Sequence, residues 1–260
     1  MIAFRVWNFY FAVVMNELHI IDQLRQARDY AEQGKSLHAI QIYRQLCSSI
    51  PELDEAWFEL AGLYAASRQP DAVEKVLLSA IERGSNSAEF QWRLAMFYMM
   101  EGRTDKATRL LRRLEDRNRL LSPRLKALLQ HSFGQLRFEQ GKLADAEQHF
   151  LRVVRLDSEF PHIHEWIAEV QLARKKHSLA LKSARVAQHA HAESWRAFYL
   201  EGKALVESSR WAEAAEAFES SIDRNPDEAT LWHACGVAWM KLRQLEKARR
   251  YITKALQLNP

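Results

Sequence analysis

The chain has 260 residues, of which 48% are hydrophobic and 27% are charged, with 37 Lys and Arg against 33 Asp and Glu. This small surplus of positive charge is no signature of nucleic-acid binding, and no run of Gly, Ser or Pro is long enough for a flexible linker. Cys47 and Cys235 lie far apart in the sequence, so we expect two buried thiols, no disulfide, and a reducing, cytoplasmic location.

Residues 1–15 form an almost wholly apolar segment that only Arg5 and Asn8 interrupt. As a helix this segment spans about 20 Å, whereas the hydrocarbon core of a membrane is about 30 Å thick. The segment also lacks the small-residue cleavage site of a secretory signal. Three interpretations stay open: Met15 is the true start, residues 1–19 cap the first repeat, or the segment is a weak anchor that associates the protein with a membrane.

Seven alanines follow one another along the rest of the chain at nearly constant spacing, with gaps of 33, 35, 39, 34, 34 and 34 residues. A period of 34 residues is typical of stacked helix-turn-helix units, each of which buries its apolar face on its neighbours. Because the second alanine arrives early, we expect the second unit to have a turn that is one residue short. The seven positions are Ala39, Ala72, Ala107, Ala146, Ala180, Ala214 and Ala248.

The seven expected units fall into two blocks that a short insertion separates. Residues 20–121 hold three units, residues 127–260 hold four, and residues 122–126 are an insertion around Pro123. Each unit is expected to have an aromatic-rich first helix of about fourteen residues, a short turn, and a second helix centred on the alanine. Every proline falls at a helix end or in a turn, as this division requires.

Six of the eight glycines occupy two recurring slots. Three of them end a first helix, where we expect a left-handed backbone, and three lie inside a first helix, where we expect close approach of two backbones. Gly62 is one residue away from the second slot. The first group is Gly34, Gly102 and Gly141, and the second is Gly134, Gly202 and Gly236.

The last unit contains, in order, Trp232, Cys235, Gly236, Trp239, Ala248, Ile252, Ala255 and Pro260. This pattern resembles the Trp, Leu, Gly, Tyr, Ala, aromatic, Ala, Pro pattern of the tetratricopeptide repeat family. The resemblance covers residues 20–260 and implies an all-α, right-handed superhelical solenoid of about seven helix-turn-helix repeats. The fifth unit departs from the pattern at Gln171 and Ala184, so we expect looser packing there.

The resemblance implies a non-catalytic scaffold that binds a helical or extended peptide in a concave groove of first helices, within a multiprotein assembly. The sequence carries no recognised catalytic, metal or cofactor motif, so we expect no enzyme activity, metal or cofactor. Methionines in the middle of the groove suit an amphipathic helix, although Trp92 and these methionines are equally suited to completing the core between repeats. The expected groove residues are Leu24, Arg28, Phe58, Trp92, Met96, Met99, Met100, His131, Gln135, Phe138, Glu165, Glu169, Tyr199 and Lys203.

Two further clusters have alternative interpretations. Six of the ten histidines lie between His149 and His191, and we interpret them as solvated turn residues because their spacing does not suit metal chelation. Residues 103–126 hold nine basic and three acidic residues, which indicates either a solvated helix face or an adaptor for nucleic acid or an anionic membrane. The arginines of this basic run are Arg109, Arg112, Arg113, Arg117 and Arg119.

The last unit also predicts self-association. Its apolar side, including Ile252 and Leu256, has no further helix after it in the sequence. Because the ends of a repeat array need a cap, we expect the C-terminal repeat to dock on a partner or on a second copy of the chain.

Overall fold

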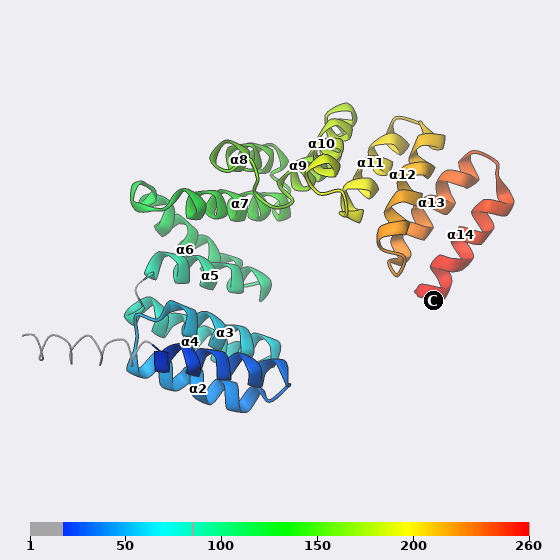
Figure 1. Cartoon of the computed structure of the whole chain (residues 1–260). Helices are drawn as coiled ribbons and strands as arrows, with labels where there is room; N and C mark the ends of the chain where they lie inside the picture. The colour runs from blue at the N-terminus through cyan, green and yellow to red at the C-terminus, as the bar shows by residue number, and fades with distance from the viewer. Residues whose placement is uncertain (1–17, 85, 260) are drawn as a thin grey trace, which may run out of the picture. The chain divides into compact units, whose positions relative to one another are not determined.

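The computed structural model describes residues 18–84 and 86–259, and this part of the chain is helical throughout, with short turns (Figure 1). The chain forms two compact units, Met1–Leu120 and Leu121–Pro260. The interpretations of the apolar N-terminal segment concern residues 1–17, which lie outside the described residues, as does Pro260. No helix of the described part has both the length and the apolar character needed to cross a bilayer.

The first unit is a stack of helical hairpins. Helix 18–32 contributes Leu24 and Ala27 to a core that also holds Tyr43 of α2. α2 packs on α3, α3 on α4, α4 on α5, and α5 on α6. The bounds are α2 (Ser36–Ser49), α3 (Asp54–Ala66), α4 (Pro70–Arg83), α5 (Ser87–Met100), α6 (Thr104–Asp116) and the short 3₁₀ helix η1 (Asn118–Leu120).

The second unit continues the same arrangement with four hairpins. The paired helices are α7 with α8, α9 with α10, α11 with α12, and α13 with α14, and each hairpin packs on the next. The bounds are α7 (Pro123–Glu139), α8 (Leu143–Leu156), α9 (Ile163–Ala173), α10 (His177–Ala190), α11 (Trp195–Glu207), α12 (Trp211–Arg224), α13 (Ala229–Lys241) and α14 (Leu245–Leu258). The prediction of an all-α helical repeat fold is confirmed.

The repeat period is more regular than the alanines indicated. In each hairpin, the fourth residue of the second helix is buried. In α4 that residue is Val73, whereas Ala72 is only half-buried. Val73 lies 34 residues from both Ala39 and Ala107. The prediction of a shortened turn was wrong, because three residues separate α3 from α4 just as three separate α5 from α6.

The extra residues of the predicted insertion belong to a helix. α7 is 17 residues long and starts at Pro123, whose fixed φ suits the first helical position. The Ser122 side chain accepts a hydrogen bond from the Leu125 backbone N–H at 3.2 Å, which caps this helix. The sequence from 122 to 126 therefore forms the cap and first turn of α7, directly after the boundary between the two units.

Both predictions for the glycine slots are confirmed. Gly34, Gly102 and Gly141 have φ of +73°, +69° and +72° in the turns after first helices. A Cβ atom at Gly134 would overlap the Phe150 ring, so this position needs a residue without a side chain. The other two glycines of the second slot are equally crowded: Gly202 by Phe218, and Gly236 by Ile252.

The same turn position has a left-handed backbone in the other four hairpins, although no glycine stands there. In each hairpin it is the middle residue of the three that separate the two helices. For a residue with a Cβ this conformation costs about 1 kcal/mol or more, so the length of the turn, rather than the residue type, dictates it. The residues are Arg68, Lys175, Ser209 and Arg243, with φ between 54° and 58°.

Cys47 and Cys235 are both free and buried, as predicted. Burial raises the pKa of each thiol to about 12. Both thiols are therefore protonated at neutral pH and shielded from reagents in solution.

The fifth repeat is closely packed, and the prediction of loose packing there was wrong. Ala184 is fully buried, and the buried Gln171 side chain donates a hydrogen bond to Glu147 at 3.1 Å. The Ser183 hydroxyl donates to the Gln171 carbonyl oxygen at 2.8 Å, and Lys176 Nζ lies 3.0 Å from Glu147. A buried polar network thus replaces the bulky residues of the other repeats.

Candidate protein-binding groove

An apolar groove of about 610 Å³ lies in the first unit, between α3, α4 and α5. Four of the predicted groove residues, Phe58, Trp92, Met96 and Met100, contribute to its lining. α3 and α5 are first helices of neighbouring repeats, and the second helix α4 contributes Val73 and Leu77 to the lining.

The α3 side of the groove is built from small residues. Ala61, Gly62 and Ala65 line it beside Phe58, and both Gly62 and Ala65 are exposed. No atom outside the helix lies within 4 Å of the position that a Cβ on Gly62 would take. This glycine therefore leaves space open, in contrast to the glycines of the crowded slot.

The α5 side carries large flexible and aromatic side chains. Trp92, Met96 and Met100 are spaced four residues apart, which places them along one face of the helix. Trp92 and Met96 are half-buried, whereas the Met100 side chain is 84% exposed. Met99 packs against the core of the unit and is not part of the groove lining.

A few charged side chains accompany this apolar surface. The Arg93 guanidinium carbon lies 4.0 Å from the centre of the Phe58 ring, and Arg93 also pairs with Glu89 at 3.2 Å on the same helix. Arg68, in its left-handed turn, and Glu101 line the groove as well. The groove thus combines an apolar wall with two arginines, of which Arg93 pairs with a glutamate of its own helix.

The other two predicted residues of the first unit do not line this groove. Leu24 is buried in the core of the unit, in the cluster that also holds Tyr43 of α2. Arg28 is exposed and forms an ion pair with Glu55 of α3.

In the second unit, the predicted residues His131 and Phe138 belong to an aromatic cluster. The His131 ring centre lies 5.7 Å from that of Phe150, 5.1 Å from that of Phe160 and 5.7 Å from that of Trp166. Burial among these rings lowers the pKa of His131 to about 4. Phe138 contacts the edge of Trp166, and Gln135 is half-buried on the same helix.

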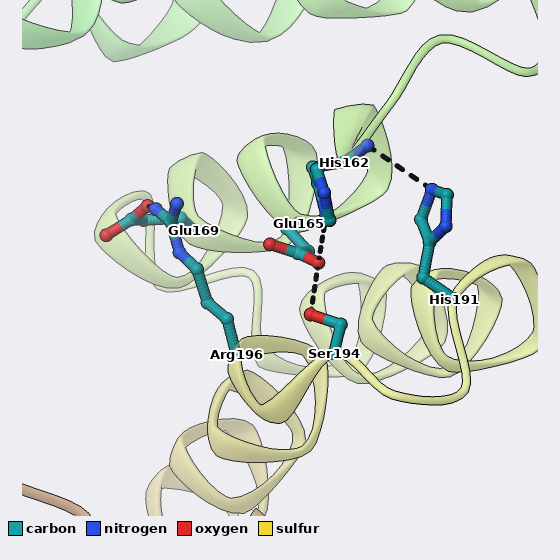
Figure 2. Close-up of polar contacts among 6 residues, drawn as sticks. All are labelled: His162, Glu165, Glu169, His191, Ser194 and Arg196. Carbon is teal, nitrogen blue, oxygen red and sulfur yellow. Dashed lines mark hydrogen bonds and ion pairs between the residues drawn. The ribbon is translucent and has the colours of Figure 1, made fainter. Parts of the chain in front are cut away.

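Glu165 is 2% exposed, whereas the sequence predicted a groove residue (Figure 2). Its carboxylate accepts hydrogen bonds from the Ser194 hydroxyl at 2.6 Å and from His162 Nδ1 at 2.9 Å. These contacts compensate the cost of burying the charge and join α9 to the start of α11. Glu165 therefore holds two repeats together.

The remaining predicted residues of the second unit also contact their neighbours. Glu169 pairs with Arg196, whose guanidinium carbon lies 4.8 Å from the centre of the Trp166 ring. Lys203 Nζ lies 5.5 Å from the centre of the Tyr199 ring. Of these side chains, Glu169, Tyr199 and Lys203 were expected to meet a partner, and sequence patterns gave no sign of their contacts within the chain.

Two of the six histidines between His149 and His191, His162 and His191, lie at turns between repeats. His149 instead lies inside α8, half-buried and stacked on the Phe133 ring, so its interpretation as a solvated turn residue was wrong. His162 has a left-handed backbone, and its ring centre lies 4.7 Å from that of His191 (Figure 2). The His162 N–H donates to His191 Nε2 at 3.5 Å. Within the described residues no group of three or more His, Cys, Asp or Glu side chains is placed to hold a metal ion.

The basic run lies on the exposed side of α6 and in the segment after it. Arg109 donates a hydrogen bond to the Asp105 carbonyl oxygen at 3.3 Å, one turn earlier in the helix. All five arginines of the run are exposed: Arg109, Arg112, Arg113, Arg117 and Arg119.

Comparisons with known proteins agree with this architecture. Residues 131–194 and 199–260 match the tetratricopeptide repeat family model. No curated protein matches the chain.

Among solved structures, MamA from Desulfovibrio magneticus RS-1 is 21% identical, with 67% of this chain and 96% of that chain covered and a TM-score of 0.58. The C-terminal part of a TPR repeat-containing protein from Cytophaga hutchinsonii is 14% identical, with 91% and 95% covered and a TM-score of 0.60. A chain of the APC/C hetero-tetramer Cut9-Hcn1 is 15% identical, with 87% and 45% covered and a TM-score of 0.70. At these identities the similarity concerns the fold.

Proposed function

Since the chain belongs to the tetratricopeptide repeat family, we propose that it is a non-catalytic protein-binding scaffold whose partner segment occupies the groove between α3 and α5. Tetratricopeptide folds generally serve protein–protein interaction, and the proposal adds the site and the kind of segment. The segment is an amphipathic helix or an extended stretch that presents apolar side chains to Phe58, Trp92 and Met96.

The exposure of Met100 beside the open space at Gly62 is the observation that carries this proposal. A methionine that is 84% exposed contributes nothing to the core, yet it extends the row of Trp92 and Met96 on the same helix face. Exposed apolar surface of this kind marks an interaction site, and thioether side chains adapt to different partner side chains.

The two arginines of the groove suggest that the partner segment carries acidic residues on its polar side. Arg93 and Arg68 are placed to meet carboxylates that flank the apolar residues of the segment. We expect such pairs to direct the orientation and the rate of association more than the affinity.

The test is a comparison of Met100→Asp with Leu120→Asp. Both residues are exposed leucine-sized side chains of the first unit, at 84% and 86%, but only Met100 lines the groove. Affinity capture from the native cell, quantified by mass spectrometry, is expected to yield proteins that bind the wild type and Leu120→Asp but not Met100→Asp. Equal capture by all three proteins contradicts the groove as the binding site.

We do not favour the basic adaptor for nucleic acid or an anionic membrane, because the family match supports protein partners. Self-association through the C-terminal repeat and a cytoplasmic location stay predictions. Leu245 and Leu256 of α14 are exposed, and Ile252 is half-buried where it packs against Gly236. Sedimentation of the wild type and of Leu256→Asp at high micromolar concentration tests the self-association.

A further inference from the structure

A second cleft of the first unit, of about 350 Å³, lies between α2 and α4, and α3 also contributes to its lining. It shares no lining residue with the groove of the proposed function. Its walls are the second helices α2 and α4, whereas the groove lies between the first helices α3 and α5, with α4 contributing a different set of residues to each. Cys47, Leu60 and Val76 are buried residues at its base.

Three cations and no carboxylate line this cleft. Arg44 comes from α2, and Lys75 and Arg83 come from α4. All three side chains are exposed, and in the described part of the chain none of them forms an ion pair. By contrast, Arg103 and Arg196 each pair with a glutamate of the neighbouring repeat. The three cations of the cleft are therefore not paired with a carboxylate of the described chain.

Hydroxyl groups alternate with the cations. Lys75, Ser79 and Arg83 are spaced four residues apart, which places them along one face of α4. On α2 the same spacing relates Arg44 to Ser48, whose hydroxyl donates to the Arg44 carbonyl oxygen at 2.8 Å. Both serines line the cleft together with Tyr64. The Ser48 hydroxyl is thus used within α2, whereas the Ser79 and Tyr64 hydroxyls accompany the guanidinium and ammonium groups of the cleft.

We propose that this cleft binds a phosphate monoester, the group that a phosphorylated serine or threonine of a partner protein presents. A phosphate monoester carries nearly two negative charges at neutral pH and three acceptor oxygens, so it matches several cations and hydroxyl donors at once. A carboxylate has one charge and two oxygens and leaves part of this set unused. Trp57 is buried at the base of the cleft, so its ring gives a nucleotide base no open face to stack on.

The test is a chemical-shift titration of the full chain with N-acetyl-O-phosphoserine amide at about 150 mM salt. We expect shifts of the backbone amides near Lys75, Ser79 and Arg83, and an affinity at least tenfold lower for the double variant Lys75→Gln, Arg83→Gln. Arg112→Gln removes an exposed cation outside the cleft and is the matched control. Because the second phosphate pKa is about 6, binding is also expected to weaken between pH 7.5 and pH 5.5.

Four results would overturn the proposal. One is the absence of shifts in the cleft, and another is an equal loss of affinity in Arg112→Gln, which shows unspecific charge attraction. The third is equal binding of N-acetyl-aspartate amide. The last is binding to vesicles that contain a phosphatidylinositol phosphate without binding of the phosphoserine compound. Met100→Asp is expected to keep phosphate binding, so a failure of the groove and a failure of the cleft are distinguishable.

Discussion

The Tyr98 hydroxyl donates a hydrogen bond to the Glu74 carboxylate, with 2.6 Å between the two oxygens, and this contact joins α5 to α4. Arg103 Nη1 lies 2.5 Å from the same carboxylate, and Lys106 Nζ lies 3.7 Å from it. The hydrogen bonds from Arg103 and Tyr98 hold the pKa of Glu74 at about 2, although partial burial acts in the opposite direction. In α8, Glu147 occupies the position that Glu74 has in α4, and its carboxylate accepts hydrogen bonds from Gln171 and Lys176.

Glu74→Gln is expected to destabilise the first unit most at neutral pH. The folded-state pKa lies below the usual value of about 4.3, so the ionised carboxylate stabilises the fold above that value, and the stabilisation is lost as the pH falls towards 2. We predict a loss of about 1–2 kcal/mol in the free energy of unfolding at pH 7 and a smaller loss at pH 3. Urea unfolding followed by circular dichroism measures both values. The exposed Glu82→Gln on the same helix is the control, and an equal loss at both pH values contradicts the prediction.

Gly62→Ala and Gly134→Ala are expected to change stability in opposite directions. The Cβ on residue 62 meets open space in a helix, so alanine raises the free energy of unfolding by about 0.5–1 kcal/mol. At residue 134 the Cβ overlaps the Phe150 ring, and alanine lowers the free energy of unfolding by about 1–3 kcal/mol. Thermal unfolding compares the two variants with the wild type. A stabilised Gly134→Ala would show that the close helix contact is absent.

Arg243→Gly is expected to stabilise the last repeat. Arg243 has φ of +58° in the turn between α13 and α14, and glycine adopts this conformation without a steric penalty. Part of the gain is offset because glycine also makes the unfolded chain more flexible, so we predict a net rise of roughly 0.5 kcal/mol in the free energy of unfolding. Arg250→Gly, in the exposed middle of α14, is expected to lower it by about 1 kcal/mol. Chemical denaturation of both variants checks the difference in sign.

The pKa of His131, which burial lowers to about 4, predicts a pH dependence of stability. Between the usual histidine value of about 6.5 and pH 4, the unfolded chain binds a proton that the folded chain does not, so stability falls as the pH falls through this range. We predict that His131→Gln reduces this fall by roughly 2 kcal/mol between pH 7 and pH 4.5. Urea unfolding at the two pH values measures it, with the exposed His189→Gln as the control. An unchanged pH dependence in His131→Gln refutes the assignment.

The features that backbone geometry dictates were predictable from the sequence. A left-handed turn at Gly102 and a close helix contact at Gly134 each require a residue type, so the sequence reveals them. Counting alanines failed at Val73, because the slot accepts any small or medium apolar side chain, and the neighbouring Ala72 resembled the expected residue. The left-handed turn at Lys175 was missed for a related reason, since turn length fixes that backbone without requiring glycine.

The candidate site was only partly predictable, because exposure depends on contacts between repeats. The row from Trp92 to Met100 follows from helical spacing and was found in the sequence. Glu165 was expected in the groove because it occupies a first-helix position that the repeat packing pattern leaves free, and its burial depends on Ser194, which is 29 residues away. Gln171 offered one usable signal: it stands in the position of Tyr98, opposite a glutamate in the position of Glu74.

Because both native cysteines are buried, a cysteine introduced into the groove can be labelled specifically. Cys47 and Cys235 are the only thiols of the chain, and neither is available as a thiolate at neutral pH. A cysteine introduced by Gly62→Cys would be the single reactive thiol, at a position where a small dye meets open space. Fluorescence of such a conjugate reports occupancy of the groove directly, without removal of the native cysteines.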